Sequence, residues 1–155
     1  MNIYTDGACR NNAKGKGDGG WACVVLQPVK GQSMQEVFRD SGYVSGTTNQ
    51  VMEIRAVTEA FEFLSDHTGM INLYSDSAYV INCLKDRWYD KWRENGWKNS
   101  KKKPVENQDE WERLLGAVEG YNVNFYHIKR NSTKYITEMD SLAKEASKKE
   151  TNQEL

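Results

Sequence analysis

The sequence predicts an α/β protein in which helices flank a five-stranded mixed sheet whose first three strands are antiparallel. Three β-rich stretches follow one another near the start of the chain, and strands then alternate with helices. Consecutive strands with short connections favour antiparallel pairing, whereas strand-helix-strand units favour parallel pairing. The 155 residues, 38% of them hydrophobic, suffice for one core, so we expect a single domain.

Five stretches are predicted to be strands, at residues 3–5, 20–26, 36–44, 70–74 and 123–128. They are rich in β-branched, aromatic and other apolar residues, and turns separate the first three, one glycine-rich and one formed by Pro28 to Gly31. The fourth is a short apolar run that ends at Ser75-Asp76-Ser77. These boundaries place acidic residues directly at strand ends.

Four helices are predicted, at about residues 50–66, 78–84, 107–119 and 137–149. In the first, apolar residues recur at helical spacing from Ala56 to Leu64, and Gly69 ends the pattern. We expect the domain to comprise residues 1–149 and the polar tail, residues 150–155, to be frayed.

The composition narrows the class of protein. The formal net charge of -1 gives no sign of a cationic surface, and the chain has neither a membrane-spanning apolar run nor the start of a signal peptide. Cys9, Cys23 and Cys83 lack the paired spacing of a disulfide framework or a zinc site. We therefore expect a cytoplasmic, monomeric protein with reduced thiols and no membrane association.

One segment departs from this balance of charge. Residues 85–103 contain eight basic and three acidic side chains, a net charge of +5, together with three of the five tryptophans, Trp88, Trp92 and Trp97. An amphipathic helix that packs through its tryptophans explains the aromatic residues but not the charge. Contact with a nucleic-acid backbone explains both.

Four acidic residues stand where a solvated surface residue is not expected. Asp6 follows the apolar first strand, and Glu53 lies three and four residues before Ala56 and Val57, so its carboxylate projects along the apolar stripe. Asp76 ends the fourth strand, and Asp140 is expected in the first turn of the last helix.

Each of these acids also has a structural explanation. Asp6 can form an Asp-Gly turn, Asp76 can cap the helix that starts near Ser77, and Asp140 can complete a capping box with Thr137. Together they favour a cluster, because strand ends and helix starts of an α/β sheet converge on one edge. Clustered carboxylates require cations, and oxygen ligands favour Mg²⁺ or Mn²⁺.

Several motifs resemble those of type 1 ribonucleases H, which cut the RNA strand of an RNA/DNA hybrid. These motifs, in chain order, are Tyr4-Thr5-Asp6-Gly7-Ala8-Cys9, Thr47-Thr48-Asn49-Gln50-Val51-Met52-Glu53, Tyr74-Ser75-Asp76-Ser77-Ala78-Tyr79-Val80 and Met139-Asp140-Ser141-Leu142-Ala143. The segment Trp88 to Val105 is similar to the family's basic protrusion, here residues 85–105. The resemblance covers about residues 2–149.

The resemblance implies a ribonuclease H-like fold and an endonuclease that uses two Mg²⁺ ions, replaceable by Mn²⁺, to leave 5′-phosphate products. Asp6, Glu53, Asp76 and Asp140 would be the metal ligands, with Asp6 as the bridge. Asn12, Asn49 and Gln50 would contact 2′-hydroxyls of the RNA, since amides both donate and accept hydrogen bonds. The positions implied for the DNA strand and its phosphates are Thr48, Trp88, Lys91, Trp92, Lys98, Asn99, Lys101, Lys102, Lys103 and Asn107.

The loop before the last helix departs from the family pattern. The family usually carries a histidine there, whereas Lys129 to Tyr135 contains neither histidine nor glycine. Lys129, Arg130 and Lys134 could supply positive charge near the scissile phosphate, but not a group that titrates near neutrality, and the sequence leaves open what replaces the histidine. Arg130 and Asn131 are the two positions nearest to the family's histidine. His127, on the last strand, is interpreted as a packing or surface residue.

Two alternatives remain at this point. One is another nuclease of the wider superfamily that shares the acidic cluster, which leaves Asn12, Asn49 and Gln50 without a role. The other is a non-catalytic protein that binds hybrids or duplexes through its basic segment and whose acids are helix caps.

Overall fold

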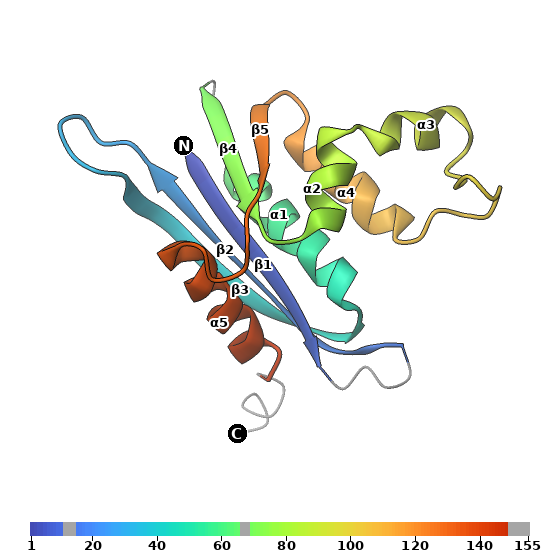
Figure 1. Ribbon diagram of the computed structural model, residues 1–155, viewed down its shortest axis with the longest axis horizontal. Helices are drawn as coiled ribbons and strands as arrows, with labels where there is room; N and C mark the ends of the chain where they lie inside the picture. Colours follow the sequence, from blue (N-terminus) through green and yellow to red (C-terminus); the bar gives the residue numbers. More distant parts are fainter. Residues whose placement is uncertain (11–14, 66–68, 149–155) are drawn as a thin grey trace.

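The computed structural model describes residues 1–10, 15–65 and 69–148 (Figure 1). The strands are β1 (Asn2–Arg10), β2 (Gly17–Gln27), β3 (Gln35–Thr47), β4 (Met70–Ser75) and β5 (Asn122–His127). The helices are α1 (Asn49–Phe63), α2 (Ala78–Lys85), α3 (Trp88–Glu94), α4 (Gln108–Val118) and α5 (Lys134–Ala146). None of the described helices is long and apolar enough to cross a lipid bilayer.

The strands form one mixed sheet in the order β3-β2-β1-β4-β5. β1, β2 and β3 pair antiparallel, while β4 pairs parallel with β1 and β5 pairs parallel with β4. The prediction of an antiparallel meander followed by parallel strands is therefore confirmed. Since β1 and β4 run in the same direction, their carboxyl ends meet at one edge of the sheet.

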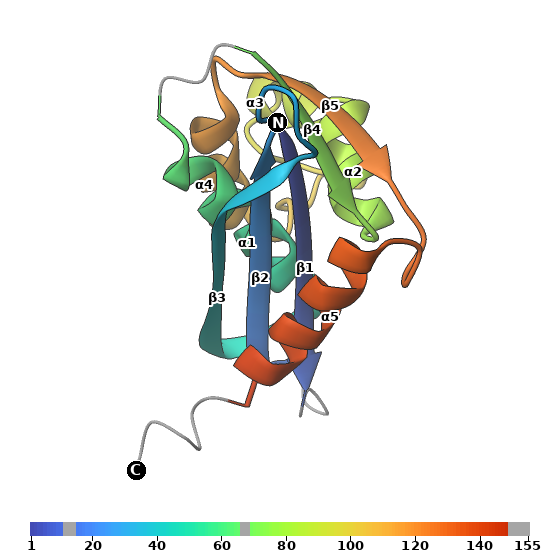
Figure 2. The same ribbon diagram turned by 90° about the vertical axis from the view of Figure 1, so that its left-hand side faces the viewer.

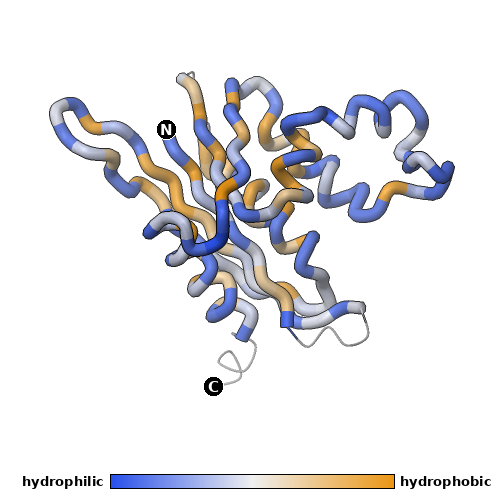
Figure 3. The backbone as a smooth tube through the Cα atoms, viewed as in Figure 1, coloured by the Kyte–Doolittle hydropathy of each residue, from blue (hydrophilic) through white to orange (hydrophobic). Residues whose placement is uncertain are grey.

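The sheet is covered on both faces over its central strands (Figure 2). Trp21, Cys23 and Val25 of β2 belong to the larger core, with α1, α2 and α4. The alternate residues of β2 pack against α5, which contributes Met139 and Ala143 to a smaller core. Figure 3 shows the resulting hydrophobic concentration along the central strands.

The last helix begins earlier than the sequence predicts. Its N-cap is Thr133, whose hydroxyl accepts a hydrogen bond from the Ile136 backbone N–H at 3.1 Å. The Thr137 hydroxyl donates to the Thr133 carbonyl at 2.9 Å, inside the helix. The predicted capping box at Thr137 is thus wrong, and Asp140 lies in the second turn of α5 rather than the first.

The basic segment forms α3 and a following loop. Trp92 contacts Trp97 and Trp111, with ring centroids 5.6 and 6.0 Å apart, and so fixes the segment to the main core. Trp88 is 39% exposed. Figure 3 shows mostly hydrophilic residues over α3 and this loop. The segment therefore has a polar surface, and Trp92 anchors it to the core.

The contact between α5 and β2 generates a prediction about stability. A Cβ added at Gly20 would lie 2.0 Å from the Ala143 carbonyl oxygen and 2.6 Å from the Ser147 backbone nitrogen. Because both are backbone atoms, α5 must move, and we expect Gly20→Ala to lower the free energy of unfolding by about 1–3 kcal/mol or more. Urea unfolding measures this difference.

The matched control is Gly116→Ala. Gly116 lies within α4, and an added Cβ there meets nothing within 4 Å. Since alanine is the better helix former by about 1 kcal/mol, this variant should be as stable as the parent or more stable. Equal stability of the two variants would contradict the close approach of α5 to β2.

Candidate active site

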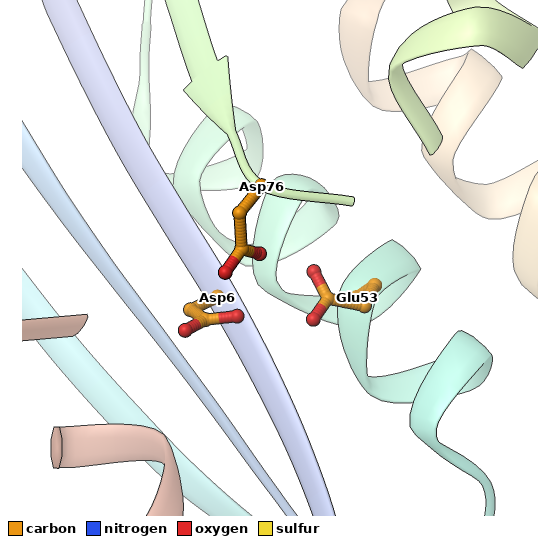
Figure 4. Close-up of side chains that lie close together, drawn as sticks. All are labelled: Asp6, Glu53 and Asp76. Carbon is orange, nitrogen blue, oxygen red and sulfur yellow. The ribbon is translucent and has the colours of Figure 1, made fainter. Parts of the chain in front are cut away.

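Three carboxylates from separate elements converge beside the sheet (Figure 4). β1 supplies Asp6, α1 supplies Glu53, and Asp76 follows β4 directly. One carboxylate oxygen from each lies within 4.8 Å of the others. The predicted convergence is therefore confirmed for these three acids.

The Gly7 backbone fixes the first two carboxylates. Its N–H donates to Asp6 Oδ1 at 2.9 Å and to Glu53 Oε1 at 3.1 Å. A Cβ at Gly7 would lie 2.5 Å from the Glu53 nitrogen, so only glycine allows α1 to approach β1 this closely. The second oxygens, Asp6 Oδ2 and Glu53 Oε2, are buried and have no hydrogen-bond partner among the described residues. Two orphaned carboxylate oxygens in an all-oxygen donor set fit a hard divalent cation.

The electrostatics agree with this donor set. Burial, reinforced by the charges of Asp76 and Asp140, raises the pKa of Asp6 to about 7. Burial, followed by the charge of Asp6, also raises the pKa of Glu53 well above its ordinary value. Without a cation, the two carboxylates cannot both ionise near neutrality at low cost.

Asp76 is left available for this cluster because another residue caps α2. The Ser77 hydroxyl accepts from the Val80 N–H at 3.2 Å, so the alternative in which Asp76 caps the helix is wrong. The Asp76 carbonyl oxygen lies 3.2 Å from His127 Nε2.

His127 lines the acidic cleft, a position that sequence reasoning did not assign to it. The available signal was the parallel pairing of the last two strands, which sets His127 opposite Ser75, one residue before Asp76.

Asp140 faces the same cleft but has different partners. Its Oδ2 lies 3.0 Å from Lys144 Nζ and 3.5 Å from an Arg130 guanidinium nitrogen, and its side chain is 19% exposed. The cleft has a volume of about 470 Å³ and includes all four acids in its lining. Lys144 was also missed, although its position four residues after Asp140 on one helix face was a readable signal.

Two of the three residues predicted to contact RNA, Asn49 and Gln50, lie at the start of α1. Asn49 lines the cleft, and Gln50 is exposed beside it. Asn12 lies outside the described residues. The Asn107 amide approaches Gln50 Oε1 at 3.5 Å and the Tyr79 hydroxyl at 3.4 Å, which joins the start of α4 to the start of α1.

Two residues predicted to hold DNA phosphate have local roles. Thr48 caps α1 by accepting from the Val51 N–H at 3.2 Å. Asn99 Oδ1 accepts from the backbone N–H groups of Lys101 and Lys103 at 2.9 and 3.1 Å, which orders the loop after α3. The amide nitrogen of Asn99 is the donor suited to a phosphate.

A hollow of about 590 Å³ lies along one side of α3. Five of the residues predicted to contact the DNA strand line it, namely Trp88, Lys91, Trp92, Lys98 and Asn99. Lys101, Lys102 and Lys103 are exposed in the adjoining loop. The cationic and aromatic residues are therefore arranged as a surface that a nucleic-acid backbone can follow.

The loop before α5 brings two cations to the acidic cleft. Lys129 and Arg130 line the cleft, and Asn131 does not. Asn131 has a left-handed backbone conformation with a φ of 62°. The structure thus gives Arg130 a specific contact, the ion pair with Asp140.

Comparison with known proteins agrees with this geometry. Residues 1–148 match the sequence profile of the RNase H family. The ribonuclease H of Thermoanaerobacter sp. (strain X514) is 44% identical over 154 residues, which cover 99% of this chain and 93% of that protein. The ribonuclease H of Clostridium botulinum (strain Hall) is 40% identical over 145 residues, which cover 93% of each.

Solved structures show the same fold. LC9-RNase H1, described as a type 1 RNase H with the type 2 active-site motif, superimposes with a TM-score of 0.81 at 25% identity, covering 94% of this chain and 71% of that one. LC11-RNase H1 in complex with an RNA/DNA hybrid superimposes with a TM-score of 0.66 at 23% identity, covering 97% and 98% of the two chains.

The raised pKa of Asp6 predicts how the metal-free protein responds to pH. The folded pKa lies above the unfolded one, so the folded state binds the extra proton and its stability falls as pH rises from about 4 to about 7. Above that range the loss due to Asp6 is complete and constant, and any further loss comes from Glu53, whose pKa is also raised. We expect the Asp6→Asn variant, which has no proton to release there, to lose less stability over this window.

Thermal unfolding in chelator at a series of pH values measures both proteins, and millimolar Mg²⁺ should restore the parent protein more than the variant. Parallel profiles for the two proteins would show that the Asp6 carboxylate does not have a raised pKa in the folded protein.

Proposed function

Because this chain belongs to the ribonuclease H family, we propose that it hydrolyses the RNA strand of RNA/DNA hybrids with divalent cations held by its acidic cluster. Asp6, Glu53, Asp76 and Asp140 would be the ligands, and Mg²⁺, replaceable by Mn²⁺, would be the cation. Two ions, with Asp6 shared between them, would accord with the resemblance to the family.

The observation that carries the proposal is the unpaired pair of buried oxygens, Asp6 Oδ2 and Glu53 Oε2, at the centre of the cluster. Carboxylates that served only as helix caps would be satisfied by backbone N–H groups. Asp6 and Glu53 instead line a cleft, where a bound cation would offset the burial of their charge.

The protein itself would position the metal ligands. β1 lies between two other strands, so it holds Asp6 rigidly, and the Gly7 N–H orients both Asp6 and Glu53. When bound, the cations would supply the Lewis acidity that activates a water and stabilises the departing 3′ oxygen. Geometry of this kind contributes to rate by positioning the reacting groups rather than by covalent chemistry.

Selectivity for RNA would come from the amide side chains near the cleft. Asn49 and Gln50 present groups that both donate and accept hydrogen bonds, as a 2′-hydroxyl does. Asn12 is proposed for the same role. On the other strand, Thr48, Asn99 and Asn107 are proposed for a DNA phosphate, and the surface along α3 for the remaining backbone.

The cations around Asp140 would replace the missing loop histidine only in part. Arg130 and Lys144 neutralise Asp140 and bring positive charge to the cleft where a new 5′-phosphate would leave. Lys129 adds a further charge. Permanent cations retain a phosphate rather than exchange it, so this arrangement favours slow product release.

The central test of this function is Asp6→Asn. The substitution keeps the shape of the side chain but removes a ligand charge, so we expect cleavage of a labelled hybrid in Mg²⁺ to fall by about a hundredfold or more. Hybrid binding, which the α3 surface would supply, should change little. Gel assays measure cleavage, and fluorescence anisotropy measures binding.

The matched control is Asp40→Asn, which removes an exposed carboxylate on β3 and should leave both quantities unchanged. Cleavage of single-stranded RNA or duplex DNA by the parent protein would favour another nuclease of the superfamily. Binding without any metal-dependent cleavage would favour the non-catalytic alternative.

A second test concerns the loop after α3. Replacing Lys101, Lys102 and Lys103 with glutamine should weaken hybrid binding and flatten its salt dependence, because phosphate contacts release counterions. Each lost contact should lower the slope of log affinity against log salt by about 0.7–0.9. The cleavage rate at saturating substrate should stay the same, since these contacts position the hybrid.

Lys30 and Lys148 provide the comparison, because both are exposed and lie outside the basic protrusion. Their replacement with glutamine should preserve the slope. If the triple variant has the parent slope, the three lysines do not meet the substrate backbone.

A further inference from the structure

A second groove runs along the outer edge of β5, on the side of α3 that does not carry Trp88. It consists of two adjoining hollows of about 390 and 380 Å³ that share Arg87, Tyr89, Val123 and Phe125. We call this surface the β5 groove. Trp88, Lys91 and Trp92 line the other hollow, on the opposite side of α3, and Arg87 contributes to both surfaces.

The β5 groove combines aromatic rings with cations. Two guanidinium groups lie over the half-buried Tyr89 ring, with Arg87 Cζ 5.1 Å and Arg93 Cζ 5.4 Å from its centroid. Arg87 is paired with Asp90 at 2.7 Å, whereas Arg93 forms no ion pair within the part of the chain that the structure describes. The lining side chains include the cations Lys85, Arg87 and Arg93 but a single carboxylate, Glu119.

The groove and the acidic cleft lie at successive positions along β5 and the residues that follow it. Residues from Asn122 to Tyr126 line it in sequence, and the next two residues, His127 and Ile128, line the cleft. β5 is the edge strand of the sheet, so no further strand covers this path (Figure 2). A strand advances about 3.3 Å per residue, so roughly 15–20 Å separate the far end of the groove from the cleft.

Tyr126 lines the end of the groove nearest the cleft, but its ring lies on the α5 side of the sheet, opposite to the face on which Val123 and Phe125 pack. It is 42% exposed, and its ring stacks on Tyr74 with centroids 5.1 Å apart. Tyr74 stacks in turn on Tyr4 at 4.7 Å, so a row of rings across three strands holds Tyr126 in place. A fixed, exposed ring at a sheet edge is suited to stacking by a base.

We propose that the β5 groove binds single-stranded nucleic acid that continues from a hybrid held in the cleft. One base would stack on the accessible part of the Tyr89 ring, and another on Tyr126 where the strand passes over the edge of β5. Phosphates would contact Arg93 and Lys85. The proposal rests on the hybrid cleavage proposed above. Acidic peptides also complement cations, but the accessible rings, the exposed amides of Asn122 and Asn124 and the short distance along β5 to the cleft favour a nucleic acid.

Fluorescence anisotropy of the full chain in chelator tests the proposal. The probes are one short blunt hybrid and the same hybrid with a single-stranded RNA or DNA tail at each of its ends in turn. At least one tail should raise affinity by about fivefold or more, because stacking of one base contributes about 1 kcal/mol at the lower end of its range. Arg93→Gln and Tyr89→Ala should each remove most of that gain.

Two controls accompany these variants. Tyr89→Phe keeps the ring and Lys30→Gln removes an exposed cation elsewhere, so both should retain the gain from the tail. Arg93 is exposed, so Arg93→Gln remains informative even if Tyr89→Ala disturbs packing. Blunt-hybrid affinity and Mg²⁺-dependent cleavage should match the parent in every variant.

Three results would overturn the proposal. In the first, no tail raises affinity; in the second, the gain survives both Arg93→Gln and Tyr89→Ala. In the third, polyglutamate binds in a way that depends on Arg93 while the tails have no effect, which assigns the groove to acidic peptides. Failure of the proposed function is a separate result, since the parent protein would then leave the blunt hybrid uncut in Mg²⁺.

Discussion

The close approach of α1 to β1 at Gly7 is the constraint on which the acidic site depends. Because no Cβ stands there, the Gly7 N–H can bind both Asp6 and Glu53, and two buried carboxylates are forced together. Parallel pairing of β4 with β1 then adds Asp76 from the same edge. A fold that concentrates like charges in this way loses stability at its site, which is typical of positions selected for function.

The four acids differ in how their charge is balanced. Asp140 already has Lys144 and Arg130 as partners, while Asp6 and Glu53 each have one buried oxygen that no described residue hydrogen-bonds. A metal ion bound by Asp6 and Glu53 therefore displaces no side chain, whereas one bound by Asp140 must compete with Lys144 and Arg130. Since both cations are more than half exposed, at 51% and 60%, they can turn toward solvent at modest cost.

Local patterns in the sequence predict much of this site. Asp6 and Glu53 stand out because each interrupts an apolar pattern, and both are buried in the structure. The helix start at Thr133 was missed because Thr133 and Thr137 are equally good caps, and only packing of the residues between them decides which is used. His127 was missed because its place beside Asp76 depends on the register of β5 against β4, a contact between distant parts of the chain.

The basic segment shows why a count of charges cannot assign a surface. α3 has seven residues, too few for a stable isolated helix, so its orientation depends on Trp92, which packs against Trp111 in the core. Once Trp92 faces inward, Trp88 and Lys91 must lie on one side of the helix and Tyr89 and Arg93 on another. The charge excess of the segment is thereby divided between two grooves. Each groove has aromatic rings among its cations, and Arg87 lines both, so one short helix can present two surfaces for a nucleic acid.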